Sequence, residues 1–193
     1  MVNKKTTILL HACCAPCTTG VYEQLNKNYE ITLFWYNPNI YPKAEHDRRL
    51  NELLNFCDSK NIRIIIGDYL WEDEHNFWLK KIKGLENELE RGKRCEVCYK
   101  LRIEATAAIA KSANDHHKNT FDLIGAELSI SPHKEARMVN TIGGKVAKKY
   151  DLKFLSTDFK KNDGYKISCE LSKKHGLYRQ NYCGCEFSIK KQK

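Results

Sequence analysis

Apolar and polar positions divide the chain into short strand-like runs and longer helix-like segments. Runs at residues 6–10, 31–36 and 62–66 are short and rich in β-branched or aromatic residues, which predicts three strands. Shorter runs at 121–124 and 153–155 predict a fourth strand and a possible fifth. The third run is apolar almost throughout, so we expect a strand that is covered on both faces.

Helical spacing of apolar side chains fills the segments between these runs. The first predicted helix begins near Pro16. The others cover residues 44–60, 71–91, 93–113 and 165–175, and one more ends at Gly143-Gly144. Strands that alternate with helices predict an α/β fold with a mainly parallel sheet and flanking helices. Because no repeat, low-complexity tract or linker interrupts the pattern, we expect a single domain over residues 1–193.

The composition adds positive charge to this picture. The net charge of +9 favours an acidic partner, with nucleic acid the first candidate, although a merely soluble basic surface has the same composition. The apolar run before His11 is too short for a signal peptide or a membrane span. We therefore expect a cytoplasmic protein with no membrane association.

Seven of the nine cysteines fall into three groups. In a reducing compartment, such grouping indicates metal ligation or redox chemistry rather than a disulfide framework. The groups are Cys13, Cys14 and Cys17; Cys95 and Cys98; and Cys183 and Cys185. The isolated Cys57 and Cys169 fall within helical patterns, and we expect both in the core.

The first group lies on the segment His11–Cys17, between a predicted strand and a predicted helix. This placement puts it at the carboxyl edge of the sheet, where open α/β sheets usually bind ligands. A helix N-terminus also favours thiolates. We predict a metal or redox site here, with His11 either packed in the core or serving as a ligand or acid–base group.

The other two groups leave alternatives open. Cys95-x-x-Cys98 is typical of half a zinc site, a dithiol redox pair or half an iron–sulfur site. Cys183 and Cys185 can both reach one metal centre, or they can form a strained disulfide that is easily reduced. A zinc ribbon built from these four would leave the first group unexplained, so redox chemistry is the favoured interpretation.

The segment 159–182 combines basic and aromatic side chains, a composition typical of proteins that bind single strands or RNA loops. The alternative is a solvated basic helix with core aromatics. The candidate tRNA contacts taken from it are Lys160, Lys161, Tyr165 and Arg179. Neither a dinucleotide-binding glycine motif nor a P-loop motif occurs in the sequence.

Several motifs together resemble those of one known family. They are His11-Ala-Cys-Cys-Ala-Pro-Cys17, Tyr36-Asn-Pro-Asn39, Arg94-Cys-x-x-Cys98, Ser131-Pro-x-Lys134, Phe159-Lys-Lys161, Gly164-Tyr165 and Leu177-Tyr-Arg-Gln-x-Tyr-Cys-Gly-Cys185. From about residue 6 to residue 188, the chain resembles the cobalamin-independent epoxyqueuosine reductases of the QueH type. That family carries Asp or Cys at the position of Cys17.

The resemblance implies reduction of epoxyqueuosine to queuosine at the wobble position (34) of tRNA, the last step of queuosine biosynthesis. It also implies a nucleotide-hydrolase-like (HUP-like) α/β fold, a [4Fe–4S] cluster and an additional mononuclear iron or other metal. Removing an epoxide oxygen takes two electrons, which no side chain supplies. We therefore expect an external low-potential electron donor.

Two ligand arrangements are consistent with the sequence. In the favoured one, the cluster is held by Cys95, Cys98, Cys183 and Cys185, and the second metal by Cys13, Cys14 and Cys17. In the other, the cluster ligands are Cys13, Cys14, Cys95 and Cys98, while Cys183 and Cys185 cycle as a redox disulfide. Adjacent residues of an extended chain point to opposite sides, which argues weakly for the first. The rival functions are a zinc-bearing RNA-binding module and a thiol–disulfide oxidoreductase without a cluster.

Overall fold

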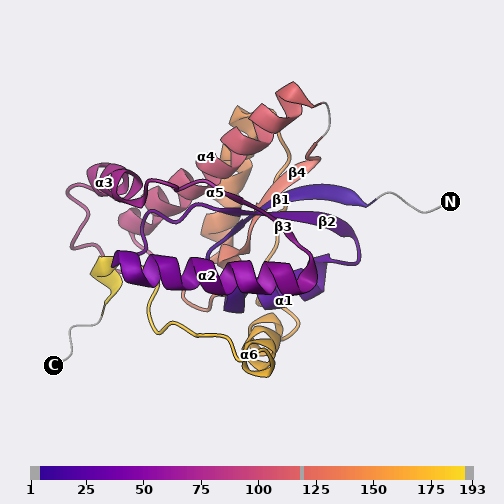
Figure 1. The fold of residues 1–193 in the computed structure, drawn as a ribbon. Helices are drawn as coiled ribbons and strands as arrows, with labels where there is room; N and C mark the ends of the chain where they lie inside the picture. Colours follow the sequence, from indigo (N-terminus) through magenta and orange to yellow (C-terminus); the bar gives the residue numbers. More distant parts are fainter. Residues whose placement is uncertain (1–4, 118–119, 190–193) are drawn as a thin grey trace.

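The computed structural model describes residues 5–117 and 120–189, and its centre is a parallel β-sheet (Figure 1). The strand order is β3-β2-β1-β4, and all three neighbouring pairs are parallel. The strands are β1 (Thr6–Ala12), β2 (Tyr29–Trp35), β3 (Arg63–Ile66) and β4 (Leu123–Ala126). The predicted α/β fold with a mainly parallel sheet is confirmed.

Helices cover both faces of the sheet. They are α1 (Ala15–Leu25), α2 (Lys43–Lys60), α3 (Trp71–Lys81), α4 (Lys93–His116), α5 (Ala136–Lys149) and α6 (Gly164–Lys174), with short 3-10 turns η1 (Glu127–Ile130) and η2 (Glu186–Ser188). Side chains of a strand alternate between its faces. Leu9 therefore packs in the core beneath α4 and α5, whereas Ile8 and Leu10 pack in the opposite core beneath α1 and α2. The predicted core position of Cys57 in α2 is confirmed, since it is buried in the second core.

The strand order creates a switch point between β1 and β4. The chain runs outward from β1 to β2 and β3, then returns to the other side of β1 at β4. The register pairs His11 with Ala126, so the two strands end nearly level. In such sheets, the segments that follow the two strands at the switch point diverge and leave a crevice for ligands. Here those segments contain the first cysteine group and η1.

The predicted end of a helix at Gly143-Gly144 is wrong, because α5 continues through both glycines to Lys149. Gly143 is buried where the ring of Phe154 crosses the helix, so closely that a Cβ at this position would overlap the ring. A Cβ at Gly144 would instead meet no atom within 4 Å. The first glycine therefore permits packing rather than ending the helix.

These two glycines should respond oppositely to alanine. Gly143→Ala is expected to lower the free energy of unfolding by about 1–3 kcal/mol, because Phe154 must move away. Gly144→Ala is expected to raise it by about 0.5–1 kcal/mol, because alanine is the better helix former and the site is open. Urea unfolding of both variants measures the difference, and equal effects would contradict the packing role of Gly143.

The burial of one strand and the ends of two helices also differ from the sequence-based prediction. β3 is an edge strand and only partly buried, rather than covered on both faces. α3 ends at Lys81 instead of reaching residue 91, since Gly84 has φ +84, a left-handed conformation that ends a helix. α4 continues to His116 beyond the predicted end at 113, and Asn114 joins it to the backbone N–H and C=O of Phe121.

The remaining differences are small. The possible fifth strand is a single bridge between Phe154 and Ile124. Cys169 is only partly buried, so the expectation of a core position for it is wrong. Residues 1–4 of the N-terminal segment and residues 118–119 of the predicted polar loop lie outside the described residues. No helix in the described part of the chain is both long and apolar enough to cross a membrane.

Candidate metal and redox site

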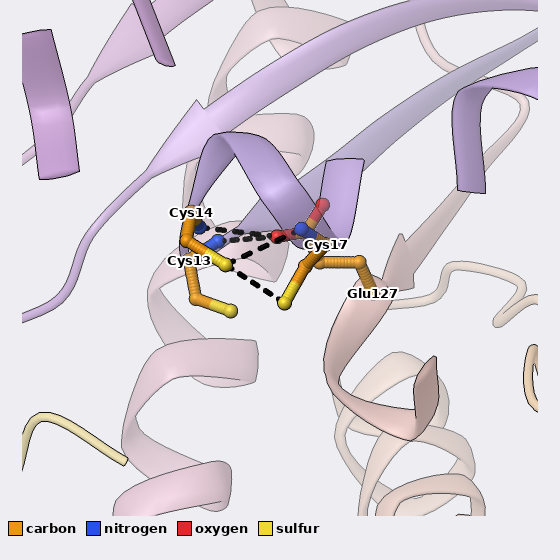
Figure 2. Close-up of side chains that lie close together, drawn as sticks. All are labelled: Cys13, Cys14, Cys17 and Glu127. Carbon is orange, nitrogen blue, oxygen red and sulfur yellow. Dashed lines mark hydrogen bonds between the residues drawn. The ribbon is translucent and has the colours of Figure 1, made fainter. Parts of the chain in front are cut away.

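The turn between β1 and α1 brings three cysteine sulfurs together (Figure 2). Cys14 is the N-cap of α1, and its Sγ accepts a hydrogen bond from the backbone N–H of Cys17 at 3.3 Å. The Sγ atoms of Cys14 and Cys17 are 2.7 Å apart. Pro16 occupies the second helical position rather than the first, where its missing N–H also leaves no helical hydrogen bond unmade.

Glu127 completes this cluster, and the sequence-based prediction missed it. Its side chain is fully buried. One carboxylate oxygen accepts the backbone N–H of Cys13 at 2.7 Å and that of Cys14 at 3.3 Å, and the other accepts the hydroxyl of Thr18 at 2.7 Å. The available signal was an acidic residue three positions after the predicted strand at 121–124. Only the pairing of β4 with β1 places it beside the thiols.

The donor set fits a metal ion. Within the described part of the chain, Cys13, Cys14, Cys17 and Glu127 are the group of possible ligands whose donor atoms all lie within 4.8 Å of one another. Thiolate and carboxylate together are typical ligands of zinc and other transition metals. Burial opposes ionisation of Cys14, but hydrogen bonds with Cys13 and Cys17 lower the pKa of Cys14 well below its ordinary value. One sulfur is thus favoured as a thiolate.

The other two cysteine groups meet at a second place. Cys95 and Cys98 lie in the first turns of α4, and together with Cys183 and Cys185 they line a cavity of about 20 Å³. Burial raises the pKa of Cys98 to about 11 and that of Cys185 to about 12. A bound metal reverses this effect, because a coordinating thiol is deprotonated outright. Four thiols match the number and kind of protein ligands that a [4Fe–4S] cluster takes.

The C-terminal segment is held in place by α2 and the loop before it. Arg49 donates to the carbonyls of Cys183 and Tyr182, at 3.1 and 3.3 Å. The backbone N–H of Tyr41 donates to the carbonyl of Gly184 at 2.8 Å. Gly184 has φ +111 and lies against Arg49 and Ile40, so a larger residue would be strained there. The glycine between the two cysteines therefore sets their direction.

A larger cavity of about 330 Å³ lies between the two sets of cysteines, the set at the start of α1 and the set around the smaller cavity. Its lining includes Cys13 and Cys17 from the first group and Cys183 from the second, and Cys183 lines both cavities. Gln180 also lines it and donates from its amide nitrogen to Cys14 Sγ at 3.1 Å. Both candidate metal positions therefore face one space large enough for part of a nucleoside.

His11 belongs to the buried network under this cavity rather than to its lining. Its Nε2 lies 3.1 Å from the carbonyl oxygen of Tyr36 and 3.2 Å from Nε of Arg102. Burial lowers the pKa of His11 well below its ordinary value, and the charge of Arg102 lowers it further. Of the roles considered for His11, packing in the core is the one that the structure supports.

Comparison with known proteins now decides the family. The family described as epoxyqueuosine reductase QueH matches residues 8–191. The chain belongs to this family. It is 38% identical to the epoxyqueuosine reductase QueH of Streptococcus pyogenes, over 97% of this chain and 72% of that relative. The corresponding values for the protein of the same name from Thermotoga maritima are 33%, 95% and 90%.

Among the solved structures that resemble this QueH family member is a tRNA-modifying protein. It is the U34-tRNA thiolase NcsA from Methanococcus maripaludis with its [4Fe-4S] cluster, with a TM-score of 0.53 and 16% sequence identity. The superposition covers 97% of this chain and 63% of the thiolase. At this identity the likeness concerns the fold alone.

The candidate tRNA contacts of this family member lie in different surroundings. Lys161 is exposed. Tyr165 is 39% exposed, and the guanidinium of Arg179 lies 5.8 Å from the centre of its ring; both residues line the larger cavity. Lys160 is less accessible, since its ammonium donates to the carbonyls of Ser129 and Lys134 at 2.7 and 3.1 Å.

Proposed function

We propose that this chain reduces epoxyqueuosine to queuosine at position 34 of tRNA, the last step of queuosine biosynthesis, in the cytoplasm. One observation carries the proposal. Two separate sets of cysteines contribute to the lining of one cavity, in a member of the epoxyqueuosine reductase family. The reaction needs a centre that transfers electrons beside a pocket for a modified nucleoside. This arrangement supplies ligands for such a centre and the pocket.

For the cofactors, we propose that Cys95, Cys98, Cys183 and Cys185 hold a [4Fe–4S] cluster and that Cys13, Cys14 and Cys17 hold a second metal, mononuclear iron or another ion. A four-iron cluster is larger than a single ion, and its ligands stand further apart. The compact group with Glu127 suits one ion, while the four thiols around the smaller cavity suit the cluster. When bound, these groups supply electrons and polarise the epoxide oxygen.

The alternative arrangement remains a competing hypothesis. In it Cys183 and Cys185 form a redox disulfide, and the first group shares a cluster with Cys95 and Cys98. Cys13, Cys14 and Cys95 do belong to one buried core cluster, which supports it. The position of Cys183 between both cavities supports the first arrangement, because a residue there can join the two centres.

We propose that the rim of the larger cavity binds the anticodon loop. Tyr165 and Arg179 together offer a flat aromatic face with a cation beside it, and unstacked bases pack on such surfaces. Lys161 supplies an exposed charge for a phosphate, and the net charge of +9 favours RNA generally. Lys160 stays a predicted contact, although its ammonium already has protein partners.

An external low-potential donor delivers the electrons for the reaction. The single domain over residues 1–193 also stays a prediction.

The test is conversion of epoxyqueuosine in tRNA by protein purified without oxygen. With a chemical reductant, the nucleosides released from the tRNA should change from epoxyqueuosine to queuosine, and the protein should contain about four or more iron atoms per chain. Zinc without iron would favour the RNA-binding module. Full thiol–disulfide activity in metal-free protein would favour the cluster-free oxidoreductase.

A further inference from the structure

Lys134 is a buried cation with no assigned task in the chemistry above. It belongs to the Ser131-Pro-x-Lys134 motif, is 7% exposed, and lines the larger cavity beside Cys13 and Cys183. Among the residues that the structure describes, its ammonium has no hydrogen-bond partner. Its nitrogen is not one of the fully enclosed, unpartnered polar atoms of the described residues, so its donors reach the open cavity. Such a group, aimed into a cavity, indicates a ligand that accepts its hydrogen bonds.

The loop that carries Lys134 is fixed by two cations from other elements. Lys160 donates to the carbonyl of Lys134 at 3.1 Å, and its own charge is paired with Asp158 at 3.0 Å. On the other side, Arg91 donates to the carbonyls of Pro132 and His133, both at 3.1 Å. The backbone of Lys134 is therefore held in place independently of its side chain.

The other cations around the cavity already have partners. Arg49 is bound to Glu45 at 2.6 Å as well as to the C-terminal segment. Arg102 donates to Asn37 at 2.6 Å and to His11. Arg179 donates to Ser172 at 3.3 Å and to Tyr165 at 3.4 Å. In the described lining, Lys134 is the cation whose donors all remain available.

We infer that Lys134 contacts the epoxide oxygen of the substrate, donates a hydrogen bond to it and supplies one of the protons with which it leaves as water. The inference rests on the proposed function. In the balanced reaction both C–O bonds break, a C=C bond forms, and the oxygen takes up two electrons and two protons. The electrons come from the external reductant and the second proton from solvent water, and the ammonium also regains its proton from solvent.

Binding without turnover gives the first test. The anaerobically purified protein, kept without reductant, is titrated with tRNA carrying epoxyqueuosine and with tRNA carrying queuosine, which differ only in the epoxide oxygen. The wild type should prefer the epoxide form about tenfold, the range of a hydrogen bond from a charged group. Lys134→Met should prefer the epoxide form about tenfold less than the wild type does, with unchanged metal content, because only the contact of the lysine is lost.

Single turnover gives the second test. With reductant, Lys134→Met should be slower by about a hundredfold or more, as for loss of a general acid. Lys134→Arg should keep the binding preference but stay slow, because a guanidinium does not give up its proton. Lys145→Met, a matched change of an exposed lysine in α5, should behave as wild type.

Two results would overturn the inference. One is an unchanged preference for the epoxide in Lys134→Met. The other is a Lys134→Met or Lys134→Arg protein at the full single-turnover rate. Loss of metal from Lys134→Met with its binding preference intact would show that the lysine only balances the charge of the thiolates. If the wild type itself fails to reduce epoxyqueuosine while still preferring it in binding, the proposed function fails and the contact survives.

Discussion

Cys95→Ser is expected to lose most of the iron of the anaerobically purified protein, whereas Cys17→Ser should keep a four-iron centre. Cys95 shares the smaller cavity with Cys98, Cys183 and Cys185, so its loss removes one of four cluster ligands. Cys17 belongs to the separate group with Glu127, so its loss should remove the second metal instead. Iron per chain and the cluster absorbance of each variant measure the difference.

Epoxyqueuosine turnover should fall by about a hundredfold or more in both variants, for different reasons. Cys95→Ser lacks the electron-transfer centre, while Cys17→Ser still accepts electrons but lacks the metal that polarises the oxygen. Cys14→Ser separates the two ligand arrangements, since it destroys the cluster only in the alternative one. Full activity of Cys17→Ser would exclude a second metal at this residue.

The isolated cysteines are the matched controls for this series. Cys57→Ala should lower stability through a small cavity, by about 1 kcal/mol, and leave the iron unchanged. Cys169→Ala should cost less, because Cys169 is only partly buried. Loss of cluster absorbance in either control would mean that serine or alanine at any cysteine disturbs the metal, and the assignment of ligands would lose its basis.

Glu127→Ala is expected to have the second largest effect. It should lower the free energy of unfolding by about 2 kcal/mol, and the protein should lose the second metal. Two backbone N–H groups, of Cys13 and Cys14, would lose their buried acceptor. Burial also raises the pKa of Glu127 well above its ordinary value, so relief from burying a carboxylate offsets part of the loss. Anaerobic urea unfolding and metal analysis check both effects.

Glu127→Gln separates the two roles of this side chain. The amide oxygen can still accept from Cys13, and its nitrogen can donate to Thr18, whose hydroxyl already lies 3.0 Å from the carbonyl of Cys14. Stability should therefore change by only about 0.5 kcal/mol, whereas affinity for the second metal should fall about tenfold with loss of the negative charge. Glu135→Ala, at an exposed position without a side-chain cap bond, should change neither. Wild-type metal affinity in Glu127→Gln would limit Glu127 to holding the backbone.

Local features of the site followed from the sequence alone. The apolar run before His11 and the helical pattern after Pro16 predicted a strand-to-helix turn. This is confirmed, since β1 ends at Ala12 and α1 begins at Ala15. The same reasoning located Cys95 and Cys98 at the start of α4. Such predictions succeed because strand and helix periods repeat over a few residues, and because turn residues act on their immediate neighbours.

Other features of the site depended on the tertiary structure. They are the place of Glu127 beside the thiols, the position of Cys183 and the hydrogen bonds of Lys160. Glu127 reaches the thiols because β4 pairs with β1, and periodicity shows which face of a strand is buried but not which strand lies beside it. The role of Gly143 depended on how Phe154, in the segment after α5, packs back onto the helix. The partial burial of β3 depended on its place at the edge of the sheet. The sequence thus determined the thiol groups and the turns that carry them. Which groups share a cavity was decided by the strand order, through contacts between residues more than a hundred positions apart.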